Sequence, residues 1–188
     1  DNGEVFHEAG RIWQRSAGQW LQGGANHIVV HSSGRLLVPI HGGEGGQFKQ
    51  HNEAWCFLSD DDGHTWRKSQ ASVDLPMRGA MEASVAELEG GRLCMSLRTQ
   101  LGSVFLSFSD DGGETWSLAQ TSGLKAPESG TCLRRIPGTN NLLLVWNDGI
   151  YDPGHHHYGR RTPLSLAVSP DEGKSWKRIG DIDSGEYE

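Results

Sequence analysis

SDDDGHTW at residues 59–66 recurs as SDDGGETW at 109–116 and as SPDEGKSW at 169–176. The shared pattern is Ser-x-Asp-x-Gly-x-(Thr/Ser)-Trp. Its Asp can accept backbone N–H bonds within a turn, its Gly can adopt a positive φ, and its Trp can pack between neighbouring sheets. Each octet therefore predicts a structural hairpin turn, whereas a calcium loop needs more ligands. The structural positions are Ser59, Asp61, Gly63 and Trp66, then Ser109, Asp111, Gly113 and Trp116, then Ser169, Asp171, Gly173 and Trp176.

The octets are spaced by about 50 and then 60 residues, which is typical of a repeat architecture. Each follows an apolar stretch, a tight turn and a second apolar stretch. In the middle unit we expect strands at 82–88, 92–97, 104–108 and 115–119.

Four short antiparallel strands per unit match one blade of a β-propeller. The expected fold class is therefore all-β, with one partial propeller domain over residues 1–188. The blades are expected at about 25–70, 80–120 and 128–182, with residues 1–24 belonging to a preceding blade.

Composition excludes several classes of protein. The net charge is −7 and the basic residues are scattered, which argues against a nucleic-acid partner. No apolar run is long enough to cross a bilayer, and no signal peptide is visible at the polar start of the chain. Cys56, Cys94 and Cys132 are odd in number and widely spaced within apolar runs, so they predict buried free thiols rather than disulfides or a zinc site.

Three distant ionisable residues are expected at one end of the blades, opposite the octets. Glu82 opens the first strand of the middle unit, Arg98 closes its second strand, and Arg161 opens the third strand of the next unit. Two guanidinium groups can hold one carboxylate, and a nearby acid can act as a base or polarise a nucleophile. Two alternatives remain open: a structural ion pair between Arg98 and Glu82, and Arg160 in the place of Arg161.

Two long connections, at 41–53 and 147–161, belong to the same end, where variable loops usually carry binding. His41 and Asn147 are accordingly candidate substrate-binding residues. The run His155–His157 admits a metal site, but adjacent residues on an irregular loop rarely point at one ion. We therefore expect an exposed loop or substrate rim there, and no metal.

The octets resemble the Asp boxes of the sialidases (neuraminidases) and of related propellers built from bacterial neuraminidase repeats. The resemblance covers about residues 25–180. It implies a six-bladed ring, of which this chain supplies about three blades.

The resemblance extends to the candidate site. Glu82, Arg98 and Arg161 match a Glu at the start of a strand, an Arg some 16 residues later and an Arg shortly before a further box. Arg161 is preferred to Arg160 because eight residues separate it from Ser169, as in the family. The resemblance implies that both arginines bind the carboxylate of sialic acid and that Glu82 activates a tyrosine nucleophile.

Other parts of the family's machinery have no match here. A further carboxylate-binding Arg and an acid/base Asp belong to earlier blades, and Arg11 lacks the surrounding pattern. The nucleophilic Tyr would fall just past Glu188, and Tyr187 ends the chain with no strand after it. The chain is therefore expected to be a catalytically incomplete fragment of a longer enzyme.

The expected function is that of an exo-α-sialidase-like glycoside hydrolase of the retaining type, acting on a sialylated or other acidic glycan without a cofactor. The alternatives are another propeller carbohydrate enzyme, such as a polysaccharide lyase acting on uronates, and a non-catalytic propeller that binds glycans or proteins. The substrate class favours a secreted or periplasmic location. Open blade edges predict self-association of the isolated chain.

Overall fold

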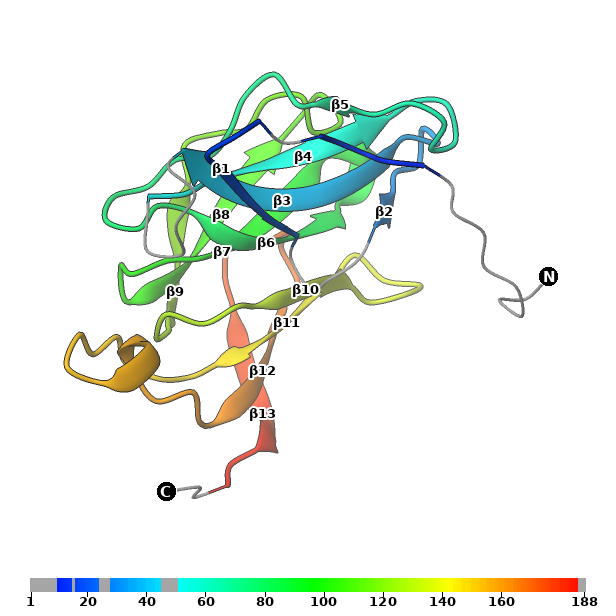
Figure 1. Cartoon of the computed structure of the whole chain (residues 1–188). Helices are drawn as coiled ribbons and strands as arrows, with labels where there is room; N and C mark the ends of the chain where they lie inside the picture. Colours follow the sequence, from blue (N-terminus) through cyan, green and yellow to red (C-terminus); the bar gives the residue numbers. More distant parts are fainter. Residues whose placement is uncertain (1–9, 15, 24–27, 45–50, 186–188) are drawn as a thin grey trace, which may run out of the picture.

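The computed structural model of the chain describes residues 10–14, 16–23, 28–44 and 51–185. These residues are all-β apart from two short 3-10 segments, at Glu89–Gly91 and His156–Tyr158. The strands form three antiparallel sheets, with the second sheet between the first and the third (Figure 1). The first sheet contains β1 (Gln19–Gly23), β2 (Val29–Val30), β3 (Leu36–Glu44), β4 (Glu53–Ser59) and β5 (Arg67–Lys68).

The second and third sheets each have four strands in sequence order, as a meander does. The second contains β6 (Met81–Glu87), β7 (Leu93–Arg98), β8 (Ser103–Ser109) and β9 (Gln120–Lys125). The third contains β10 (Cys132–Arg135), β11 (Leu142–Asn147), β12 (Leu164–Ser169) and β13 (Lys177–Asp183). This arrangement is consistent with propeller blades.

The first sheet differs from the expectation that residues 1–24 belong to a preceding blade. The short β2 pairs only with the start of β3, so the end of β3 has backbone groups to satisfy on that edge. Strand β1 fills this edge, with Gln22 opposite His41. Residues 19–23 are therefore part of the first sheet.

The last strand of the second sheet also begins later than the expected 115–119. At the end of the second Asp box and just after it, side chains replace part of the backbone pairing: Asp111 accepts the Thr115 backbone N–H at 3.0 Å, and the Ser117 hydroxyl accepts the Phe108 N–H at 3.0 Å. Regular pairing resumes at Gln120, beside an irregularity in β8.

The Asp boxes have the same internal bonding in all three copies. In the first, Gly63 N–H donates to Ser59 Oγ at 2.9 Å, and the Thr65 N–H and hydroxyl donate to the Asp61 carboxylate at 2.8 and 2.6 Å. The hydrogen bonds from Thr65 and Ser59 lower the pKa of Asp61 to about 2. Gly63 has a φ of +85°, which glycine adopts without strain. The boxes are therefore the structural turns that the sequence predicts.

Two apolar clusters join the sheets. One includes Leu37 and Leu58 of the first sheet with Val85 and Met95 of the second, and Trp116 packs against it. The other joins the second and third sheets, and Trp176 packs against that cluster. These two tryptophans of the boxes therefore stabilise contacts between sheets, as expected.

The cysteines are all free thiols, but they are not equally buried. Cys56 and Cys94 are fully buried, and burial raises the pKa of each thiol. Cys132 is only partly buried because it lies at the start of β10, beside a surface hollow. The expectation of burial therefore fails for Cys132.

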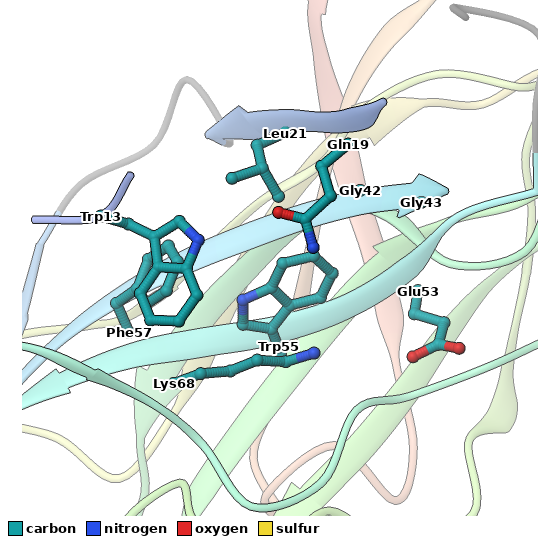
Figure 2. A pocket seen from close by; sticks show the side chains of 9 residues that line it. All are labelled: Trp13, Gln19, Leu21, Gly42, Gly43, Glu53, Trp55, Phe57 and Lys68. Carbon is teal, nitrogen blue, oxygen red and sulfur yellow. The ribbon is translucent and has the colours of Figure 1, made fainter. Parts of the chain in front are cut away.

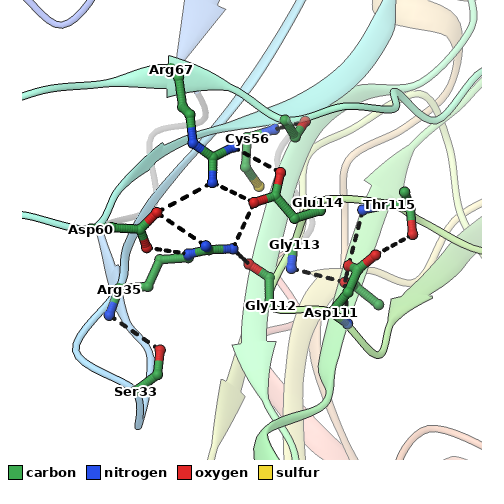
Figure 3. A network of polar contacts seen from close by, with 12 residues as sticks. Ser33, Arg35, Cys56, Asp60, Arg67, Asp111, Gly112, Gly113, Glu114 and Thr115 are labelled. Carbon is green, nitrogen blue, oxygen red and sulfur yellow. Dashed lines mark hydrogen bonds and ion pairs between the residues drawn. The ribbon is translucent and has the colours of Figure 1, made fainter.

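Charged side chains also tie the sheets together at the box end (Figure 3). Arg35, in the turn before β3, contacts Asp60 of its own box at 2.6 Å and Glu114 of the next box at 3.1 Å, and it donates to the Gly112 carbonyl. Arg67 also contacts both carboxylates. Because Arg35 is largely buried and bonds across two sheets, it fixes their relative position.

Among the described residues, no helix is long or apolar enough to cross a membrane.

Candidate functional site

Glu82 lies at a distortion in the first strand of the second sheet. Its φ is +42°, an uncommon conformation for a residue with a side chain, and the pairing of β6 with β7 shifts register between Met81 and Ser84. The Glu82 N–H does not join the ladder but donates to His41 Nδ1 at 3.1 Å. Backbone strain of this kind is often kept at functional sites, which makes Glu82 a candidate.

Arg98 lies beside Glu82, as the sequence predicts. Its Nη1 donates to Glu82 Oε1 at 2.7 Å, and its Nη2 donates to Glu128 Oε1 at 3.3 Å. Only 11% of the Arg98 side chain and 25% of the Glu82 side chain are exposed. The structural ion pair that the sequence left open is therefore present, and Arg98 also reaches a second carboxylate.

Glu128 is fully buried at the centre of this cluster. Its Oε1 accepts hydrogen bonds from Arg98 and from Arg78, and its Oε2 accepts one from Gln100 at 3.0 Å. A buried carboxylate is tolerated when it is paired and hydrogen-bonded in this way.

Arg161 lies in the connection between β11 and β12 of the third sheet, and its side chain reaches the same cluster. Its Nη2 donates to the Glu128 carbonyl at 3.1 Å, and the Asn147 amide donates to the Arg161 carbonyl. Arg161 is an exposed residue. Its pKa is lowered, first by partial removal of the guanidinium from water and then by the positive charge of Arg98. Two arginines and one acid that are distant in sequence thus lie close together.

The structure gives His41 and Asn147 different contacts from those the sequence suggested. His41 is only 4% exposed, and its Nδ1 accepts the Glu82 N–H, so it supports Glu82 rather than facing solvent. Burial, followed by the charges of Arg98 and Arg78, lowers the pKa of His41 to about 4. Asn147 holds the backbone of the 147–161 connection.

The histidine run is exposed, and its first member bonds locally, with His155 Nδ1 2.6 Å from the His156 carbonyl. Within the part of the chain that the structure describes, no three His, Cys, Asp or Glu side chains gather as metal ligands would. Tyr187 lies outside the described residues.

Sequence reasoning missed Arg78, Gln100 and Glu128. A usable signal was present, because the connections PMRGAM (76–81) and APESG (126–130) lead into β6 and β10 at the same end as Glu82. Each connection contains an ionisable residue, Arg78 or Glu128, that strand direction places at the same end of the sheets as Arg98. What the sequence does not reveal is that Glu128 points inward.

A hollow of about 320 Å³ lies beside Glu82, with Gln22, Gly130 and Thr131 among its walls. A Cβ added at Gly130 would lie 2.6 Å from Glu82 Oε2. Because glycine has no side chain, Gly130 leaves space for the Glu82 carboxylate.

A smaller hollow, of about 130 Å³, lies on the first sheet and shares no lining residue with the Glu82 cluster (Figure 2). Trp13 stacks on Phe57 there with 5.2 Å between ring centroids, and the Lys68 ammonium lies 4.1 Å from the ring centroid of Trp55. These contacts are typical of a chain segment packed on a sheet. The Glu82 cluster is therefore the stronger candidate for chemistry.

Comparison with known proteins found a curated relative. The chain is 34% identical over 179 residues to the anhydrosialidase of Macrobdella decora, covering 82% of this chain and 23% of that protein. It therefore spans about a quarter of that relative's length.

Solved structures show the same fold. The sialidase of Trypanosoma rangeli, in complex with the inhibitor DANA, matches with a TM-score of 0.68 and 22% identity, over 89% of this chain and 26% of that one. The NanB sialidase of Streptococcus pneumoniae matches with a TM-score of 0.63 and 24% identity, over 87% of this chain and 24% of that one.

The family described as BNR repeat-like domain matches residues 1–188, which is the whole chain. Together with the three Asp boxes and the blade-like sheets, this match shows that the chain belongs to the BNR repeat-like domain family, within the sialidase superfamily.

Proposed function

We propose that the chain carries part of the active site of an exo-α-sialidase-like glycoside hydrolase. Arg98 and Arg161 bind the carboxylate of a terminal sialic acid, and Glu82 is the acidic partner of the nucleophile. His41 and Asn147 support Glu82 and Arg161 and do not touch the sugar.

The observation that carries the proposal is the charge balance around Arg161. Among the residues that the structure describes, no carboxylate lies within ion-pair distance of its guanidinium. Among the described residues, the ion pairs of the cluster join Arg78 and Arg98 to Glu82 and Glu128, and none of them involves Arg161. Arg161 is an exposed residue whose guanidinium meets a neutral carbonyl, and a ligand carboxylate would neutralise its charge.

Arg98 and Arg161 have further N–H groups with which to bind a ligand carboxylate. Arg98 uses one N–H on each terminal nitrogen for Glu82 and Glu128, and each terminal nitrogen carries a second N–H. Arg161 donates from Nη2 to a neutral carbonyl, that of Glu128. Two guanidinium groups with free donors can hold a carboxylate through several charge-assisted hydrogen bonds.

The proposal includes a six-bladed ring in which the three sheets form about half. A third carboxylate-binding Arg, an acid/base Asp and a nucleophilic Tyr would come from other blades, by analogy with the family. We also propose that the isolated 188-residue chain self-associates through unpaired strand edges. Size-exclusion chromatography at several concentrations tests this, and a concentration-independent monomer contradicts it.

The test of function compares two neighbouring arginines in the full-length protein. Release of a fluorogenic sialoside is measured for the wild type, Arg161→Met and Arg160→Met. The proposal expects kcat/KM to fall at least 100-fold in Arg161→Met, because a charge-assisted pair of bonds to the substrate is lost, and to change less than threefold in Arg160→Met.

Other outcomes decide between the alternatives. Formation of an unsaturated uronate from an acidic polysaccharide, without sialoside cleavage, would favour the lyase. Glycan binding without any turnover would favour a binding module. Equal activity in Arg161→Met and the wild type would overturn the proposed role of Arg161.

A further inference from the structure

We propose that Glu128 is a positioning residue that sets the orientation of both Arg98 and Arg161 for a ligand carrying a single carboxylate. This inference rests on the proposed function and deepens it. Glu128 does not touch the ligand, since its carboxylate is fully buried.

The contacts of Glu128 make it the common support of the two arginines. Its carboxylate accepts a hydrogen bond from Nη2 of Arg98 at 3.3 Å. Its backbone carbonyl accepts a hydrogen bond from Nη2 of Arg161 at 3.1 Å. One residue therefore holds one guanidinium by its side chain and the other by its main chain. A displacement of Glu128 would disturb both arginines at once.

Glu128 is itself held from two further directions. Arg78 bonds to Oε1, and Gln100 donates to Oε2 at 3.0 Å. These partners occupy the carboxylate and compensate its burial, so its position is well determined. Arg78 also offsets its negative charge, whereas Arg161 meets only its neutral backbone carbonyl.

A positioning role and simple electrostatics predict opposite changes in the affinity for a carboxylate ligand when Glu128 is replaced in Glu128→Gln. Removing a negative charge raises the positive charge of the cluster, and by charge alone an anion should bind more tightly. If Glu128 orients the arginines, the same change weakens its hold on Arg98, because an uncharged amide oxygen replaces the carboxylate, and carboxylate binding weakens as well. The sign of the change in affinity therefore separates the two explanations.

The experiment measures the Kd of N-acetylneuraminic acid by calorimetry on the full-length protein. We expect Glu128→Gln to raise Kd at least tenfold. The matched control is Glu114→Gln, since Glu114 also accepts bonds from two arginines, Arg35 and Arg67, but at the box end. Glu114→Gln should lower the melting temperature and leave Kd within twofold of the wild type.

A second variant covers the case in which Glu128→Gln does not fold. Gln100→Leu removes the bond to Glu128 Oε2 without changing any charge. Positioning predicts a Kd raised about threefold, whereas electrostatics predicts no change. An unchanged or lower Kd in Glu128→Gln, or an unchanged Kd in Gln100→Leu, overturns the inference. A wild-type protein that does not bind N-acetylneuraminic acid contradicts the proposed function itself.

Discussion

His41 should make the stability of this protein fall between neutral pH and pH 5. Its imidazole is buried beside Arg98 and Arg78, and its pKa is lowered from 6.5 to about 4. The unfolded chain therefore takes up a proton at this histidine at a pH where the folded chain does not. A folded-state pKa below the unfolded value means that stability is full above pH 6.5 and is lost as the pH falls toward 4.

The size of the effect follows from the shift. A change of about 2.5 pKa units corresponds to about 3 kcal/mol when the whole window is crossed. Most of this loss occurs between pH 7 and pH 5, where the free energy of unfolding should fall by about 2 kcal/mol.

Urea denaturation at pH 7, 6 and 5 measures this loss, and His41→Asn isolates its source. The Asn amide oxygen can accept the Glu82 N–H in place of Nδ1, but it does not titrate. We expect His41→Asn to reduce the loss to less than about 0.5 kcal/mol.

His51 provides the control. This histidine is exposed, and the Met77 carbonyl and Asp74 raise its pKa, so its stabilising effect is present at low pH and is lost as the pH rises. His51→Asn should therefore keep the acid loss or make it slightly larger. Equal stability of the wild type at pH 7 and pH 5, or the same loss in His41→Asn, would refute the reasoning.

Three further predictions concern other parts of the molecule. Gly130→Ala places a Cβ 2.6 Å from Glu82 Oε2, so sialoside turnover should fall at least tenfold while the melting temperature changes little. Gly113→Ala adds a Cβ 2.5 Å from a Leu37 methyl group at a φ of +90°, and urea denaturation should show a loss of about 2–4 kcal/mol. Arg35→Met breaks the contacts of Figure 3 and should lower the free energy of unfolding by about 1–2 kcal/mol, more at low salt than at high salt.

Much of the fold could be predicted from local sequence. The Asp box contains its own hydrogen-bond partners within eight residues, so each octet closes its turn almost independently of the rest of the chain. Period and apolar pattern then locate most strands of the second sheet to within a residue. The misplaced strand is β9, because the side chains of Asp111 and Ser117 compete with regular pairing after the box.

The candidate site was predicted only in part. Glu82, Arg98 and Arg161 could be named because strand direction sends the ends of several strands to one side of the molecule. Glu128 could not be recognised in the same way, since nothing in APESG indicates whether its acid is solvated or buried. The sequence made His41 a candidate for binding the sugar, but it did not reveal its bond to the backbone of Glu82.

The repeat, the turns and the family of this protein could be read from the amino-acid sequence, because they depend on residues near one another along the chain. Which charges face one another depends instead on the packing of the sheets. The bonds that Glu128 makes to Arg78, Arg98, Gln100 and Arg161 span 28 to 50 residues of sequence. Their existence depends on how two sheets pack, and pairing of this kind leaves no local signature in the sequence.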